Sequence, residues 1–273
     1  MKKRVLINAP IDPDDLSRLR SLTEVVGVDQ GDIGDRILDY VPFDAIIASA
    51  VIPLDSVLFN HLEGLSVIGR LGTGVDNVNL EDATKWGIIV INTPGAPTIS
   101  TAEHTFALIL ALAKDIVYQD RVLKHGDWSV RHQRIGRDLF NMTIGLVGFG
   151  KIGQRVAQLC AAFGMQIMVF DPYVDKKDSW NTRVEFIHTL QDLLPKVDII
   201  SIHAPLQAST HHLLGEPEFK LMQSHAWLIN TSRGGLVDEK ALIEALKSGR
   251  IAAAGLDVFE PEPPSAVNPL FRM

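Results

Sequence analysis

The stretch TIGLVGFGKIGQRVAQLCAAFGMQIMVFD, residues 143–171, decides the fold of this chain. An apolar run predicts a β-strand that enters a glycine loop, Gly148, Gly150 and Gly153, with G-x-G-x-x-G spacing. An amphipathic helix follows, and a second apolar run ends on Asp171. Strand, glycine loop, helix, strand and acid in this order predict a site that holds a dinucleotide.

Each part of this stretch has a mechanical task. Gly148 allows the tight turn, Gly150 lets backbone N–H groups approach a pyrophosphate, and Gly153 lets the helix pack close to the strand. The helix begins at Lys151 and Ile152, where unpaired N–H groups and the positive end of the helix dipole favour phosphate. These five residues are therefore candidate cofactor-binding residues.

Asp171 lies eighteen residues after Gly153, at the end of the second predicted strand. A carboxylate at this position accepts hydrogen bonds from both ribose hydroxyls and repels a 2′-phosphate. The predicted cofactor is therefore NAD and not NADP.

Composition favours a cytoplasmic enzyme. The 273 residues carry a formal net charge of −7, so we expect no broad basic face for nucleic acid. Cys160 is the only cysteine, which excludes an internal disulfide, and we expect it to be a small buried hydrophobe. The first residues, MKKRVLINAP, predict a β-strand that is too short for a signal peptide or a membrane span.

Short apolar runs alternate with helical patterns along the whole chain. This alternation predicts an α/β fold with parallel strands in two layered units, joined near residue 98 by NTPGAPTIST (92–101). A long apolar helix is expected from Thr101 to Gly126. The other predicted helices are 13–21, 33–39, 55–61 and 80–86, and the predicted strands are 4–8, 25–28, 44–49, 66–69, 88–91, 143–148, 165–170, 184–187, 198–203, 226–231 and 251–257.

Further polar motifs follow predicted strands of the second unit. His203-Ala204-Pro205 follows DIISI, Thr231-Ser232-Arg233 follows AWLIN, and Asp257 follows AAAGL with Glu262 five residues later. The carboxyl ends of parallel strands meet at one edge of a sheet, where such sheets place their ligands. We therefore expect these residues to converge on one site.

Several motifs together resemble the D-isomer-specific 2-hydroxyacid dehydrogenases. They are GFGKIG (148–153), SIHAPL (201–206), NTSRGGLVDEKALIEAL (230–246), GLDVFEPEPP (255–264) and the loop that begins RLGTGVDN at Arg70. The resemblance implies a Rossmann NAD-binding domain inserted into a flavodoxin-like substrate domain, with the active site in the cleft. It assigns residues 1–97 to an incomplete substrate domain, 98–265 to the NAD-binding domain and 266–273 to a stub.

The resemblance also implies roles for single residues. Arg233 offers a planar cation to the carboxylate and carbonyl of a 2-oxo acid, and Glu262 orients a proton-donating histidine. Backbone N–H groups of Thr73 and Gly74 bind the substrate carboxylate, with Arg70 nearby. The remaining cofactor contacts are His203, Pro205 and Thr210 on the adenosine side and Thr231, Ser232 and Asp257 near the nicotinamide. No metal is expected.

Plainer interpretations of the same residues stay open. Arg233 also suits a helix cap or the surface, Glu262 a solvated loop and Asp257 the end of a strand. Thr73 and Gly74 also suit an ordinary turn. His203 suits a wall of the cleft as well as it suits a chemical role.

The sequence departs from the family at the catalytic histidine. In the family this histidine follows the position of Glu262 by a few tens of residues, in a T-P-H pattern on one more strand. None of the nine histidines occupies that motif; they are His61, His104, His125, His132, His188, His203, His211, His212 and His225. We expect either a truncated product that lacks this strand and the closing helix, or a chain that binds NAD and turns over poorly.

The resemblance implies a small 2-oxo or 2-hydroxy acid as the substrate, and its identity stays open. RLGTGVDN resembles the phosphoglycerate dehydrogenase branch, but a second phosphate-binding arginine of that branch corresponds to Ser49. Because a phosphate normally calls for more than one cation, hydroxypyruvate and glyoxylate are alternatives to 3-phosphoglycerate. The rival function is an NAD-sensing, corepressor-like binding protein. The apolar helix that begins at Thr101 also predicts a homodimer.

Overall fold

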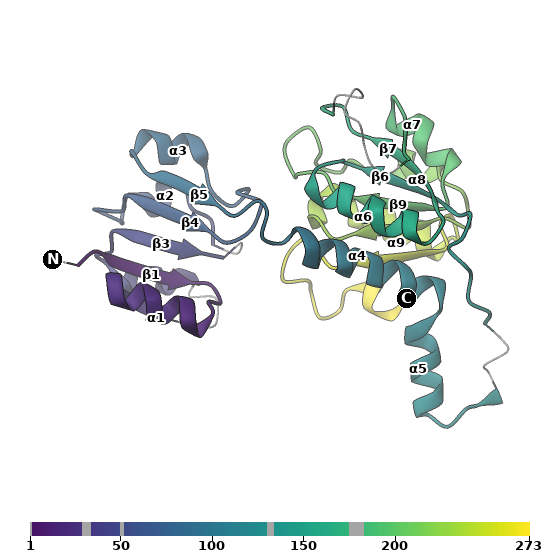
Figure 1. The fold of residues 1–273 in the computed structure, drawn as a ribbon, viewed down its shortest axis with the longest axis horizontal. Helices are drawn as coiled ribbons and strands as arrows, with labels where there is room; N and C mark the ends of the chain where they lie inside the picture. The colour runs from purple at the N-terminus through teal and green to yellow at the C-terminus, as the bar shows by residue number, and fades with distance from the viewer. Residues whose placement is uncertain (1, 29–33, 50–51, 130–133, 175–182) are drawn as a thin grey trace. The chain divides into compact units, whose positions relative to one another are not determined.

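The computed structural model describes residues 2–28, 34–49, 52–129, 134–174 and 183–273. The chain divides into two compact units, Met1–Pro97 and Thr98–Met273, and each has its own sheet (Figure 1). Within the described ranges, no helix is long and apolar enough to cross a membrane.

The first unit is a five-stranded parallel sheet in the order β2-β1-β3-β4-β5. This 2-1-3-4-5 order is that of flavodoxin-like doubly wound sheets. The strands are β1 (Arg4–Asn8), β2 (Glu24–Val28), β3 (Ala45–Ala48), β4 (Val67–Arg70) and β5 (Ile89–Asn92). The helices are α1 (Pro13–Leu22), the 3₁₀ helix η1 (Gly34–Tyr40), α2 (Ser56–Phe59) and α3 (Leu80–Lys85).

The second unit is a six-stranded parallel sheet in the order β11-β10-β9-β6-β7-β8. This sheet has the doubly wound arrangement of dinucleotide-binding sheets, and its strand order reverses between β6 and β9. The predicted α/β fold is therefore confirmed. The strands are β6 (Thr143–Val147), β7 (Gln166–Phe170), β8 (Glu185–Phe186), β9 (Ile199–Ile202), β10 (Trp227–Asn230) and β11 (Ala253–Leu256).

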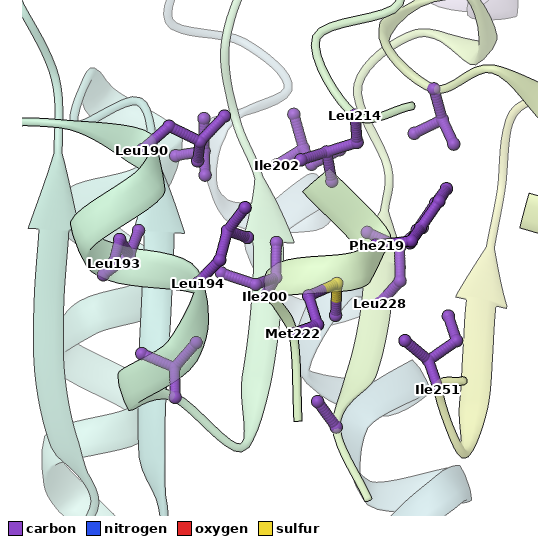
Figure 2. Packing of buried hydrophobic residues seen from close by; sticks show 14 of the residues in the cluster. Leu190, Leu193, Leu194, Ile200, Ile202, Leu214, Phe219, Met222, Leu228 and Ile251 are labelled. Carbon is purple, nitrogen blue, oxygen red and sulfur yellow. The ribbon is translucent and has the colours of Figure 1, made fainter. Parts of the chain in front are cut away.

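Helices cover both faces of the second sheet. On one face, α4 (Thr98–Ala113) and α6 (Lys151–Ala162) pack on inward side chains such as Trp227 and Ile229. The opposite face carries α7 (Leu190–Leu193), α8 (Glu216–Leu221) and α9 (Glu239–Lys247), which enclose Leu228 and its neighbours (Figure 2). Successive side chains of a strand point to opposite faces, so β10 contributes to both cores. Short 3₁₀ helices complete the unit: η3 (Leu194–Lys196), η4 (Gly234–Leu236) and η5 (Pro269–Arg272).

The prediction of one long helix over residues 101–126 is wrong. The structure has two helices, α4 and α5 (Ile116–Lys124), because the chain turns at Asp115, whose φ is +52°. The carbonyl of Ala113 accepts a hydrogen bond from the N–H of Arg137 at 2.7 Å, and so it is taken from the helical ladder. Aspartate tolerates the left-handed conformation better than most residues, which allows the break there.

The remaining predicted elements lie close to the observed ones where the structure describes them, and the differences are confined to a few residues at their ends. The segment predicted as a helix at 33–39 is the 3₁₀ helix η1, and residue 33 lies outside the described residues. Pro42, which lacks an N–H, follows it closely and prevents its extension. Cys160 is fully buried, as predicted, and burial raises the pKa of its thiol to about 12.

Candidate functional site

The loop after β6 is shaped by contacts between backbone atoms. Gly148 has φ +98°, and a Cβ added there would lie 2.7 Å from the carbonyl oxygen of His203. A Cβ on Gly153 would lie 2.4 Å from the carbonyl oxygen of Gly148. Both positions therefore require glycine for internal packing. A Cβ on Gly150, by contrast, would meet nothing within 4 Å, so its surroundings are open.

The N-terminus of α6 presents unused donors beside this open space. The first hydrogen bond of the helix runs from the N–H of Gln154 to the carbonyl of Gly150 at 3.0 Å. Among the described residues, nothing accepts from the N–H groups of Lys151, Ile152 or Gly153, and the N-cap Gly150 has no side chain to cap them. Free N–H groups at the positive end of a helix dipole form an anion site.

Asp171 ties the end of β7 to the glycine loop. Its Oδ2 accepts from the N–H of Phe149 at 2.7 Å, and its Oδ1 accepts from the N–H of Tyr173 at 2.8 Å. Each carboxylate oxygen can accept a second hydrogen bond, so the group still has capacity for a ligand. The sequence predicted ligand contacts for Asp171 but did not foresee that it also holds the loop.

His203 forms the other side of the glycine loop. Its N–H donates to the carbonyl of Val147 at 2.7 Å, and its Nε2 lies 3.0 Å from the hydroxyl of Ser201. Its Nδ1 is buried without a hydrogen-bond partner in the described structure. Burial lowers the pKa of His203 to about 4, so the imidazole is neutral at pH 7. His203 therefore adds no charge beside the glycine loop at neutral pH.

Two further predicted cofactor residues follow His203 in the same loop. The hydroxyl of Thr210 donates to the carbonyl of Pro205 at 2.7 Å and accepts from the N–H of Gln207 at 2.9 Å. Thr210 therefore closes the turn that carries Pro205.

Asn230, at the end of β10, positions Arg233. The buried amide accepts from the N–H of Ser232 at 3.0 Å and donates to the carbonyl of Arg233 at 2.8 Å. The hydroxyl of Ser232 donates to the carbonyl of Ile202 at 2.9 Å, and Arg233 Nη1 donates to the carbonyl of Ser232 at 2.7 Å. The end of β10 thus fixes the backbone at Ser232 and Arg233.

The loop after β11 packs directly against this arginine segment. The N–H of Asp257 donates to the carbonyl of Asn230 at 3.0 Å. A Cβ on Gly234 would overlap the carbonyl of Phe259 at 1.9 Å, so only glycine permits this approach. Glu262, which is exposed, accepts from the N–H of Phe259 at 2.9 Å.

Helix α4 supports the same edge of the sheet. The hydroxyls of Thr105 and Thr231 lie 2.7 Å apart in a buried contact, and His104 Nε2 lies 3.3 Å from Asp257 Oδ1. Sequence reasoning missed His104 and Thr105, and it missed Asn230 as a positioning residue. An amide that closes an otherwise apolar strand was the available signal for Asn230.

The predicted substrate residues lie in the first unit, at the carboxyl end of β4. Arg70 is only 5% exposed, and its Nε donates to Asn77 Oδ1 at 3.0 Å. The carbonyl of Thr73 accepts from the Asn92 side chain at 2.8 Å. In the described structure, no hydrogen bond starts from the N–H of Thr73 or Gly74, so both donors are available to a ligand.

Within the second unit, the predicted residues occupy the carboxyl ends of parallel strands. The glycine loop, Asp171 and His203 surround the point where the strand order reverses, between β6 and β9. Arg233 and Glu262 follow the next two strands, β10 and β11. The fold and the free helix N-terminus define this unit as a Rossmann dinucleotide-binding unit.

Comparison with known proteins agrees with this class. Residues 106–273 match the family model described as D-isomer specific 2-hydroxyacid dehydrogenase, NAD binding domain. The D-3-phosphoglycerate dehydrogenase of Methanocaldococcus jannaschii is 40% identical over 99% of this chain and 51% of its own length. The glyoxylate reductase of Korarchaeum cryptofilum is 37% identical over all of this chain and 84% of its own length. The crystal structure of the TT0316 protein from Thermus thermophilus has a TM-score of 0.90 and 37% identity, over 98% of this chain and 86% of that one.

The chain belongs to the D-isomer-specific 2-hydroxyacid dehydrogenase family, and residues 106–273 form its NAD-binding domain. The resemblance seen in the sequence is therefore confirmed. The chain spans about half the length of the phosphoglycerate dehydrogenase from M. jannaschii.

The two glycine positions predict different stability effects. Gly148→Ala forces a Cβ into the His203 backbone at positive φ, and we expect it to lower the free energy of unfolding by roughly 1–3 kcal/mol. Gly150→Ala, whose Cβ meets open space, should change it by less than about 0.5 kcal/mol. Urea denaturation followed by circular dichroism measures both. Equal losses would contradict the difference in packing.

Burial of His203 predicts a pH dependence of stability. The unfolded chain protonates this residue below about pH 6.5, whereas the folded chain does so only near pH 4. As the pH is lowered from about 6.5 to about 4, the free energy of unfolding should therefore fall by about 1.4 kcal/mol per pH unit. This loss adds to the contribution of other groups. His203→Asn should remove this component, and His61→Asn, at an exposed position, should retain it. Parallel slopes for the wild-type chain and His203→Asn would overturn the assignment.

Proposed function

We propose that this chain is an NAD-dependent oxidoreductase that interconverts a D-2-hydroxy acid and a 2-oxo acid by hydride transfer. The observation that carries the proposal is the position of Arg233, which Asn230 fixes beside the loop of Glu262 in a dinucleotide-binding unit. A permanently charged guanidinium at this edge suits a substrate that carries adjacent carboxylate and carbonyl groups.

The residues at the glycine loop fit a dinucleotide. The open space at Gly150 and the unused N–H groups of α6 would receive the pyrophosphate, and Asp171 would accept from the ribose hydroxyls. When bound, NAD supplies the hydride acceptor or, in its reduced form, the hydride donor. Thr231, Ser232 and Asp257 would lie on the nicotinamide side, and His203, Pro205 and Thr210 on the adenosine side.

Arg233 and Glu262 would have different roles toward the substrate. Arg233 would bind the carboxylate and polarise the carbonyl oxygen at which negative charge develops. Glu262 would accept a hydrogen bond from a proton-donating imidazole, hold its orientation and raise its pKa. The exposed carboxylate is held in place by the N–H of Phe259.

The substrate-binding loop would be 70–74 in the first unit, which we propose as the substrate domain. The N–H groups of Thr73 and Gly74 would take the substrate carboxylate. Arg70 is turned inward onto Asn77, and Ser49 offers no charge. This favours a small acid such as glyoxylate or hydroxypyruvate over a phosphorylated one, which calls for exposed cations.

We further propose that the chain forms a homodimer through α4, α5 and the segments beside them. Large apolar side chains are exposed on this part of the second unit, among them Ile116, Val117, Trp128 and Ile135. Isologous pairing is the commonest way to cover such a surface.

Cofactor preference provides a direct test of Asp171. NADH should bind at least about tenfold more tightly than NADPH, because the carboxylate repels a 2′-phosphate. Asp171→Asn removes the charge and keeps one of the two acceptors that hold the loop, so it should narrow this ratio even if both affinities fall. Fluorescence titration measures the two dissociation constants. Equal affinities for the wild-type chain would contradict NAD preference.

Reduction of 2-oxo acids tests Arg233. With glyoxylate, hydroxypyruvate or 3-phosphohydroxypyruvate, Arg233→Ala should lower kcat/KM by roughly 10²–10³-fold while NADH binding persists. Arg18→Ala, an exposed arginine of α1, is the matched control and should behave as the wild-type chain. Reduction that survives Arg233→Ala would contradict the assignment. Because no histidine of this chain occupies the T-P-H position, tight NADH binding without turnover of any 2-oxo acid fits both a poorly active dehydrogenase and the rival function, an NAD-sensing binding protein.

A further inference from the structure

Two adjacent histidines and one glutamate meet on the surface of the second unit. His211 Nε2 lies 3.2 Å from Glu260 Oε1, and His212 Nε2 lies 2.7 Å from Glu260 Oε2. The two imidazole rings stack with centroids 3.8 Å apart and an interplanar angle of 23°. Both ring edges therefore point at one carboxylate, and none of these residues belongs to the nucleotide or substrate site proposed above.

The histidine segment is held by its backbone. His212 has φ +52°, a left-handed conformation in which histidine is enriched, and its N–H donates to the carbonyl of Gly235 at 2.8 Å. The N–H of His211 donates to the carbonyl of Gln207 at 2.9 Å. The next anchor is Leu214, which is fully buried in the core shown in Figure 2. Because the backbone of His211 and His212 is already held, a ligand of the two rings would need to order little of the chain.

The glutamate is positioned from the opposite side. A Cβ on Gly235 would lie 3.0 Å from Glu260 Oε1, so the carboxylate rests over a residue that has no side chain. Its neighbour Phe259 packs on Gly234, and the N–H of Glu260 lies 3.4 Å from Glu239 Oε2. Burial opposes ionisation of Glu260, but hydrogen bonds with His212 and His211 lower its pKa, and the group is an anion at neutral pH.

We propose that His211, His212 and Glu260 form a binding site for a divalent transition-metal ion of the zinc type. Two imidazole nitrogens and a carboxylate oxygen are a ligand set that zinc accepts, with water in the fourth position. The candidate ligand atoms all lie within 4.8 Å of one another. Tetrahedral bonds of about 2.0–2.2 Å need ligand atoms roughly 3.3 Å apart, so small rotations of these partly exposed side chains suffice.

Protonation states are compatible with this ligand set. Both histidines must offer the Nε2 lone pair, so the proton of each neutral imidazole moves to Nδ1 or, from an imidazolium, is released to solvent. Magnesium and calcium prefer oxygen ligands and are not expected to bind.

Other histidine–carboxylate pairs in the described structure are simpler. His225 lies 2.8 Å from Asp198, and His104 lies 3.3 Å from Asp257, each with a single imidazole. Among the described residues, only the group at Glu260 brings three candidate ligands together. His225 therefore provides a matched control for a surface histidine bonded to an acid.

Bound metal would strengthen the connection between two loops that already meet through Glu260 and through residues 234–236. One is the turn that carries Pro205 and Thr210, and the other is the loop of Phe259 and Glu262. The site does not depend on the proposed function, because its ligands and its test involve the metal alone.

Calorimetric titration of the chain, produced without a polyhistidine tag, with zinc chloride tests the site. We expect one zinc ion per chain. His212→Asn and Glu260→Gln should each weaken binding by at least about tenfold, because each removes a ligand. His225→Asn should bind as the wild-type chain, and magnesium chloride should give no binding heat. Circular dichroism checks that each variant is folded.

Hydrogen exchange provides a second measurement that does not rely on affinity. Zinc should slow exchange in residues 207–214 and 257–263 of the wild-type chain and leave both segments unchanged in Glu260→Gln. Absence of zinc binding by the wild-type chain would overturn the proposal. So would zinc binding that survives both His212→Asn and Glu260→Gln, or that His225→Asn abolishes.

Discussion

The backbone contact between Gly148 and His203 is the constraint on which the nucleotide site depends. It lies at the carboxyl ends of β6 and β9, where the strand order reverses, and doubly wound sheets bind their ligands at such a point. A side chain at Gly148 would separate the loops that follow β6 and β9, and one at Gly153 would lift α6 off the sheet. The position of the helix N-terminus, and with it the anion site, follows from these two close approaches.

A close backbone approach at a glycine also positions Arg233. Gly234 lets the chain after Arg233 contact the carbonyl of Phe259, and the buried amide of Asn230 bonds to the N–H of Ser232 and the carbonyl of Arg233. Glycine, which has no side chain, allows the close approach of the two loops, and the amide of Asn230 fixes the course of the backbone through Ser232 and Arg233. An arginine that is held in this way loses little entropy on binding a planar anion, which suits the role proposed for it.

Asp171 and His203 show how residues of the site also serve the fold. Asp171 accepts from the N–H groups of Phe149 and Tyr173, and so it organises the loop beside which it would contact a ribose. His203 is kept neutral by burial, so it adds no charge beside the glycine loop. Changes at either residue therefore alter loop structure and ligand binding together. The ratio of the NADH and NADPH affinities, or the pH dependence of the free energy of unfolding, separates these two effects better than a single affinity does.

Much of this organisation was determined by the sequence alone. Apolar runs, the glycine spacing and the acid at 171 predicted the parallel strands, the nucleotide loop and the residues around it, because these signals are local in the chain. Only the tertiary structure decided the break at Asp115, which depends on Arg137 taking the carbonyl of Ala113. Only the tertiary structure bonds Asn230 to the backbone of Arg233 and turns Arg70 inward onto Asn77. It also brings His211 and His212 to Glu260, which lies 49 and 48 residues away in the sequence. Such contacts are fixed by where packed strands end in space, and no pattern along one segment of chain records that position.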